Sequence, residues 1–182
     1  MLKYRFKTLI FIVLLLISAT LSAQQRDPMQ YFFHPLFGDL SEERITATDE
    51  NKKAIMLMFE EDDCPFCARM KKTVLNQVAV QDYFRKNFHI LLIDKEQTDE
   101  FIDFKGNSTT MKDFAEKEHR VRATPVFLFF DLEGNKLKRG RFTGAAASID
   151  EFMALGRYYA EGFNNKTSFR NFKKVLKESQ AR

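Results

Sequence analysis

The two cysteines of the chain, Cys64 and Cys67, lie three positions apart at a junction between a strand-like and a helix-like sequence pattern. The apolar run at 54–59, shortly before them, has the length and continuity of a buried β-strand. Pro65 follows the first cysteine, and its fixed φ and missing N–H suit the first turn of a helix. Apolar residues then recur at helical spacing to about residue 76. The pattern predicts a strand followed by a helix that begins at the cysteine pair.

The rest of the chain continues with strand-like and helical segments. A second apolar run lies at 88–94, and a crossover of this length implies parallel pairing of the two strands. Downstream we expect a polar insertion, a helix, a hairpin and two helices, at 95–110, 111–120, 123–143, 148–160 and 168–178. This order, with a CxxC pair opening the first crossover helix, resembles the thioredoxin fold. The predicted class is α/β, with a central mixed sheet flanked by helices, an N-terminal extension, a short insertion before the strand that opens at Pro125, and an extra C-terminal helix.

Residues 1–23 have the three parts of a secretory signal peptide. A basic start precedes the apolar run 9–17, and small and polar residues lead to Ala23. The apolar run is too short for a membrane span, which needs about 20 residues. The pattern predicts cleavage near Ala23 and a periplasmic location, with retention of the segment as an anchor as the alternative.

Residues 24–182 are expected to form a single thioredoxin-like domain, with its core at about 40–162 and its last helix at about 168–178. The full chain has a formal net charge of +4. The signal segment holds three of the 29 basic residues and no acidic one, so 26 basic residues then face 25 acidic ones and the charge falls to +1. This balance gives no reason to expect nucleic acid as a partner. Nothing resembles a dimerisation segment, so we expect a monomer.

The spacing of the cysteines favours chemistry over scaffolding, because a disulfide that closes so short a loop constrains the unfolded chain very little. At the N-cap of the predicted helix, Cys64 faces unpaired N–H groups and the positive end of the helix dipole. Both favour the thiolate, which is the attacking species in thiol–disulfide exchange. We expect Cys64 to attack a partner disulfide and Cys67 to resolve the mixed disulfide. The redox-active Cys64–Cys67 disulfide is then the only redox group required, and no further cofactor is expected.

Thr124 and Pro125 are expected to form the second half of the site. A proline that opens the hairpin strand of this fold stands opposite the CxxC pair, and its preceding peptide bond is usually cis. The backbone of Thr124 is then free to pair with an extended substrate segment. With Pro65 and Phe66 these residues are the candidate substrate contacts. An ordinary trans proline at a strand entrance is the alternative.

Metal and haem chemistry find little support in the sequence. A zinc site would need two ligands besides the cysteines, and His34, His89 and His119 are scattered singly. We expect no metal, and ordinary surface or edge positions for the three histidines. Covalent haem attachment needs CxxCH, but Ala68 follows the second cysteine.

Several stretches carry a resemblance more specific than CxxC, namely 58–70, 103–106, 121–127, 129–134, 141–144, 152–162 and 168–169. In them the sequence resembles the SoxW-type periplasmic thioredoxin-like proteins, over most of residues 54–175. The resemblance implies a thioredoxin fold, export and dithiol–disulfide exchange, with the dithiol kept reduced by a membrane electron carrier. By position it makes Cys64 the nucleophile, Cys67 the resolving thiol and Pro125 the cis-proline.

Two positions depart from thioredoxin itself. Asp63 stands where an aromatic residue usually precedes the first cysteine, and Met58 stands where thioredoxins keep a buried acid. Proton transfer to Cys67 must therefore use another group, for which Glu60 and a water molecule are the candidates.

The acidic run 60–63 bears on the direction of electron flow. Like charge disfavours the Cys64 thiolate, and a less stable thiolate makes the dithiol a better reductant. Our hypothesis is a reductase of protein disulfides, supplied by a membrane electron donor of thiol type; if the acidic side chains are merely solvated, the argument loses its force. The alternatives are a periplasmic thiol oxidase or isomerase, and a thioredoxin-fold module that only binds a partner.

Overall fold

The computed structural model describes residues 25–180. The predicted signal peptide lies outside them. In chain order the elements are α2 (Pro28–Tyr31), α3 (Leu40–Asp49), β1 (Ala54–Glu60), α4 (Pro65–Thr73), α5 (Val78–Asn87), β2 (Phe88–Asp94), β3 (Glu100–Ile102), β4 (Ser108–Thr110), α6 (Met111–Asp113), the π-helix η2 (Phe114–Glu118), β5 (Val126–Phe130), β6 (Lys136–Thr143), α7 (Ile149–Ala160), the 3₁₀-helix η3 (Phe163–Asn165) and α8 (Phe169–Gln180). Within this part of the chain, no helix is both long and apolar enough to cross a membrane.

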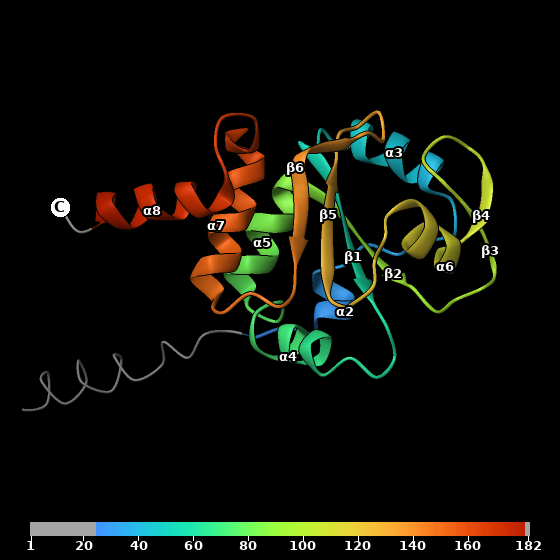
Figure 1. Cartoon of the computed structure of the whole chain (residues 1–182), viewed down its shortest axis with the longest axis horizontal. Coiled ribbons are helices and arrows are strands. Elements are labelled where there is room, and N and C mark those ends of the chain that lie inside the picture. The colour runs from blue at the N-terminus through green and yellow to red at the C-terminus, as the bar shows by residue number, and fades with distance from the viewer. Residues whose placement is uncertain (1–24, 181–182) are drawn as a thin grey trace, which may run out of the picture.

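Four strands form the central sheet in the order β2-β1-β5-β6 (Figure 1). The two continuous apolar runs, β1 and β2, pair in parallel, as the long crossover through α4 and α5 predicts. β5 runs antiparallel to β1, and β6 returns antiparallel to β5 as the second arm of a hairpin. The sheet is therefore mixed, with helices on both faces, and the predicted fold class is confirmed.

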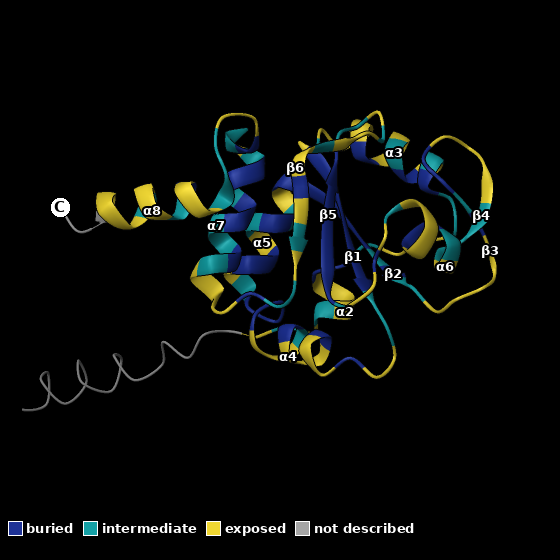
Figure 2. Cartoon of the chain, in the orientation of Figure 1, coloured by how far each residue is buried: buried dark blue, intermediate teal, exposed yellow. Residues whose placement is uncertain are grey.

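Alternation along β1 divides the core between the two faces of the sheet. Met56 and Met58 belong to one buried cluster, which includes residues of α4, α5 and α7. Ile55, Leu57 and Phe59 belong to the other, which includes residues of α3 and η2. β1 and β5 are buried from end to end apart from the last residue of β1, which explains their continuous apolar sequences (Figure 2).

Three additions surround this core at the predicted places. The N-terminal extension forms α2 and buries Phe32 and Phe33. The insertion after β2 contains the β3–β4 hairpin, which buries Phe101. α8 packs its first turns against α7 through Phe172 and then projects away from the body of the molecule (Figure 1). The start and end of α8 differ from the predicted 168–178 by one and two residues, within the usual fraying of helix ends.

The two edges of the central sheet differ in what covers them. At β2, the backbone N–H of His34 donates to the carbonyl of Ile90 at 2.8 Å, so the extension covers part of that edge. At β6, four basic residues crowd a mostly exposed strand: Lys136, Lys138, Arg139 and Arg141.

Candidate active site

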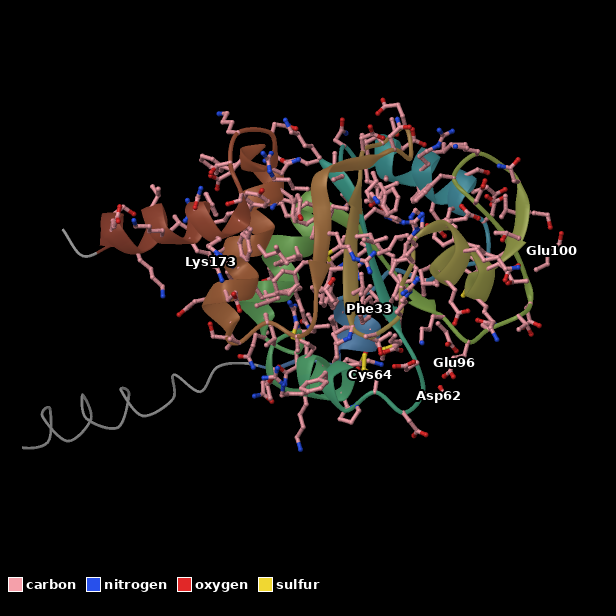
Figure 3. The ribbon with its side chains drawn as sticks, viewed as in Figure 1. Phe33, Asp62, Cys64, Glu96, Glu100 and Lys173 are labelled. Atoms are coloured by element: carbon pink, nitrogen blue, oxygen red, sulfur yellow. A yellow bond between two sulfur atoms is a disulfide. The ribbon has the colours of Figure 1, made fainter. Side chains whose placement is uncertain are left out.

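The cysteine pair lies just beyond the carboxyl end of β1, where Cys64 is the N-cap of α4 (Figure 3). Its backbone is extended, with φ −108° and ψ 95°, and Pro65 takes the first helical position. The backbone N–H of Cys67 points at the Cys64 sulfur, with an N···Sγ distance of 3.1 Å. The two cysteines form a disulfide. The helix terminus thus directs a backbone donor at the sulfur predicted to be the nucleophile, and this contact favours its thiolate.

The residues between the cysteines are more exposed than the cysteines themselves. Cys64 and Cys67 are 7% and 2% exposed, whereas the Phe66 side chain is 59% exposed. The Arg69 guanidinium lies 5.8 Å from the centre of the Phe66 ring. Phe66 is therefore a large apolar side chain held at the surface beside the disulfide, and the substrate contact expected of it and of Pro65 stays a prediction.

Thr124 and Pro125 immediately precede β5, and the peptide bond between them is cis. The register of β1 and β5 pairs Phe59 with Val126, so this turn lies beside the loop that leads to Cys64. The carbonyl of Pro125 accepts a hydrogen bond from the N–H of Gly144 at 2.8 Å. Among residues 25–180 the backbone N–H and C=O of Thr124 form no hydrogen bond, which leaves them open to an extended segment of another chain.

Two of the four acidic side chains in the loop 60–63 form ion pairs. Glu60 forms an ion pair with Lys71, with an Nζ–Oε2 distance of 2.7 Å. Glu61 forms one with Lys95, also at 2.7 Å, and accepts a hydrogen bond from the Thr124 hydroxyl at 2.6 Å. These two partners lower the pKa of the Glu61 carboxyl. Two of the four charges that the sequence sets against the Cys64 thiolate are therefore neutralised locally.

The other two acids of the loop, Asp62 and Asp63, are exposed and form no ion pair within the described residues. The backbone N–H of Asp62 donates to the Glu96 carboxylate at 3.1 Å, which brings a third negative side chain to this rim (Figure 3). The unpaired side chains on this side of the cysteines are therefore negatively charged, as the acidic run predicts. Their total charge is smaller than the sequence suggests, because two of the four acids of the run are paired.

The sequence profile of the thioredoxin-like domain family matches residues 40–160. The chain belongs to this family. Solved structures share the fold at low identity. A thioredoxin-fold protein from Helicobacter pylori has a TM-score of 0.54 at 21% identity, covering 70% of this chain and 82% of that one. A thioredoxin from Thermus thermophilus gives 0.50 at 21% identity, covering 65% and 82%. A DsbH oxidoreductase gives 0.53 at 16% identity, covering 79% and 96%. No curated protein sequence matches the chain.

Met58 occupies the position at which thioredoxin itself keeps a buried acid, so this chain has no acid at that position. Met58 is fully buried in the same cluster as both cysteines. Glu60, two residues further along the strand, faces the same side of the sheet, where Lys71 on α4 holds both of its carboxylate oxygens. Glu60 is therefore paired with Lys71, which lies one helical turn beyond Cys67, and it is not an isolated base.

The histidines are more buried than a surface position implies, although His34 and His89 do lie at the β2 edge of the sheet, where they meet. His34 stacks on His89 with ring centres 4.2 Å apart, and His89 Nε2 lies 2.6 Å from a Glu43 carboxylate oxygen. These residues are far apart in the sequence and lie at the start of the strands, away from the cysteines. Burial lowers the pKa of His34 to about 4. No periodic pattern in the sequence predicts this cluster, because it depends on how the extension lies along β2.

The histidine pair and Glu50 offer three ligand atoms within 4.8 Å of one another. Their arrangement does not fit a shared ion. Stacked rings direct their nitrogen lone pairs along nearly parallel planes, and His34 Nδ1 already accepts the N–H of Ile90 at 2.9 Å. The Lys52 ammonium lies 3.2 Å from the Glu50 carboxylate and supplies a cation there. The cluster is better explained as a polar network that links the extension to the domain.

Proposed function

We propose that this thioredoxin-like domain is an exported thiol–disulfide oxidoreductase of the SoxW type, which reduces protein disulfides in the periplasm after cleavage near Ala23. The observation that carries the proposal is the position of Cys64 at the N-cap of α4, with the N–H of Cys67 directed at its sulfur. The adjoining turn at Thr124 and Pro125 offers free backbone groups to a substrate. We further propose that the protein acts as a monomer and uses no cofactor besides this disulfide.

The reaction begins with the reduced pair. The Cys64 thiolate attacks one sulfur of the substrate disulfide, that S–S bond breaks, and the departing sulfur takes a proton. Cys67 loses its proton and attacks the Cys64 sulfur of the mixed disulfide, which releases the second substrate thiol. The substrate has gained two electrons and two protons, and the pair has become the Cys64–Cys67 disulfide. A membrane electron donor of thiol type returns it to the dithiol by the same exchange in reverse.

Two opposing features determine the direction of electron flow. The α4 N-terminus and the Cys67 N–H favour the thiolate, and therefore the reduced form and an oxidising protein. The unpaired carboxylates of Asp62, Asp63 and Glu96 disfavour it, which makes the dithiol more reducing. We assign the greater effect to the carboxylates, because three charges act on one exposed rim. The helix contact favours the second candidate, a thiol oxidase or isomerase.

The reduction potential of the purified chain tests this assignment by equilibration against graded thiol buffers. We expect a value near that of thioredoxin, about −270 mV, together with catalysis of insulin disulfide reduction. A value near that of DsbA, about −120 mV, would establish the oxidising candidate instead.

Two single-cysteine variants test whether the pair catalyses exchange at all. Cys64→Ser should abolish turnover, and Cys67→Ser should trap a mixed disulfide through Cys64 that non-reducing electrophoresis resolves. A wild-type protein without turnover whose Cys64→Ser variant still holds its partner would be a binding module.

A further inference from the structure

One side chain of the acidic loop connects three segments that are distant in the sequence. Glu61 follows β1, Lys95 follows β2, and Thr124 precedes β5. The carboxylate of Glu61 accepts the Thr124 hydroxyl through Oε1 at 2.6 Å and pairs with the Lys95 ammonium through Oε2 at 2.7 Å. Both oxygens are therefore occupied, and each contact limits the freedom of the other.

The contacts of Glu61 differ from those of its neighbours in the loop. Glu60 pairs with Lys71 on the helix that carries the cysteines, whereas Asp62 and Asp63 are exposed. Glu61 alone in this loop reaches the residue before Pro125. Two residues separate it from Cys64, so its hydrogen bond joins the two halves of the exchange site directly.

The Thr124 side chain needs such an anchor because its backbone lacks one. The N–H and C=O of Thr124 form no hydrogen bond within residues 25–180, although the next carbonyl, that of Pro125, accepts the N–H of Gly144. The hydroxyl is thus the polar group that fixes this residue within the described chain. Its partner lies 63 positions earlier in the sequence, which explains why no local pattern reveals the contact.

We propose that Glu61 is a positioning residue for thiol–disulfide exchange, which holds Thr124 and the turn at Pro125 in register with Cys64 so that a docked peptide presents its sulfur to the nucleophile. The inference rests on the proposed function. Lys95 assists by fixing the carboxylate. Neither residue takes a proton or touches the reacting sulfurs.

The proposal predicts that large and small disulfide substrates respond differently to loss of the connection. A protein disulfide must dock along Thr124 before its sulfur is aligned, whereas a small aromatic disulfide needs only access to Cys64. A misplacement of about 1 Å can lower a rate by up to about 100-fold when geometry supplies part of the rate enhancement. Variants that break the connection should therefore slow reduction of insulin about tenfold and change reduction of 5,5′-dithiobis(2-nitrobenzoate) less than twofold.

The test uses the full chain and three substitutions. Thr124→Val removes the hydroxyl and keeps the side-chain shape, Glu61→Leu removes both contacts, and Thr124→Ser keeps the hydroxyl. We expect the first two to show the selective loss on insulin and the serine variant to retain the wild-type ratio of the two rates. Glu133→Gln, which removes an exposed carboxylate from the turn between β5 and β6, is the charge control. Equal losses on both substrates, or no loss on insulin, would overturn the proposal.

A second measurement does not depend on activity. The amide of Gly144 donates to the Pro125 carbonyl and reports on the turn. Hydrogen exchange at this amide should be faster in Thr124→Val than in wild type, and unchanged exchange would overturn the anchoring role. If wild type reduces neither disulfide, the proposed function fails, and this amide still decides whether Glu61 anchors the turn.

Discussion

His119 provides a quantitative test of how burial couples protonation to stability. Its ring lies between Phe114 and Phe130, with centres 4.5 and 5.4 Å away. Burial, followed by the nearby charges of Lys136 and Arg141, lowers the pKa of His119 to about 4 from 6.5. The unfolded chain therefore binds a proton at His119 more readily than the folded chain between these values. The stability contributed by the neutral ring is present above pH 6.5 and is lost as the pH falls towards 4.

The size of the effect follows from linkage. A full shift from 6.5 to 4 lowers the free energy of unfolding by about 1.8 kcal/mol between pH 7 and pH 5. The ring is only partly buried, so solvent screening reduces this to about 1 kcal/mol. His119→Phe removes the titration and keeps an aromatic ring. We expect the variant to lose about 1 kcal/mol less than wild type over this interval.

Urea unfolding followed by circular dichroism at pH 7 and pH 5 measures the difference by linear extrapolation. Other titrating groups, including His34, are common to both proteins and cancel in the comparison. If wild type and His119→Phe lost the same stability between the two pH values, burial would not hold His119 neutral, and the argument would fail.

Two further substitutions test the packing of the core and of a turn by urea unfolding. Phe152→Ala removes a buried ring that stacks on Phe84 at 4.5 Å, and should cost about 3–5 kcal/mol of unfolding free energy; a loss under about 1 kcal/mol would contradict this packing. Gly134→Ala should cost about 2–4 kcal/mol, because φ is +83° and the added Cβ would lie 2.6 Å from that of Phe104. Gly106→Ala, at φ +82° with nothing within 4 Å, is the control and should cost about 1 kcal/mol; equal losses would refute the role of the contact.

The sheet and the cysteine helix could be predicted because their signals are local. The run that became β1 is apolar at every position to Phe59, and β1 is buried at each of them. Pro65 marks the start of α4 by its own chemistry. The hairpin of β5 and β6 follows from an apolar run, a turn at Gly134 and a second strand.

The charges of the site could not be predicted in the same way. Four consecutive acids look alike in a sequence, yet Glu60 and Glu61 are paired and Asp62 and Asp63 are not. Their partners lie 11 to 63 positions away, and the strand register brings them together. The histidine pair shows the same limit, because it depends on contacts between the extension and β2.

The treatment of the sheet edges has a consequence for self-association. An open edge of unpaired backbone groups invites strands of other molecules and promotes aggregation. Here the N-terminal extension blocks part of the β2 edge through His34, and the β6 edge carries a row of cations that repel the same row on a second copy. Backbone pairing with a foreign chain is thereby discouraged along both edges, whereas the backbone groups of Thr124 form no hydrogen bond within residues 25–180. Under the proposed function, extended polypeptide would pair with the protein at Thr124 and not along the two edges of its sheet.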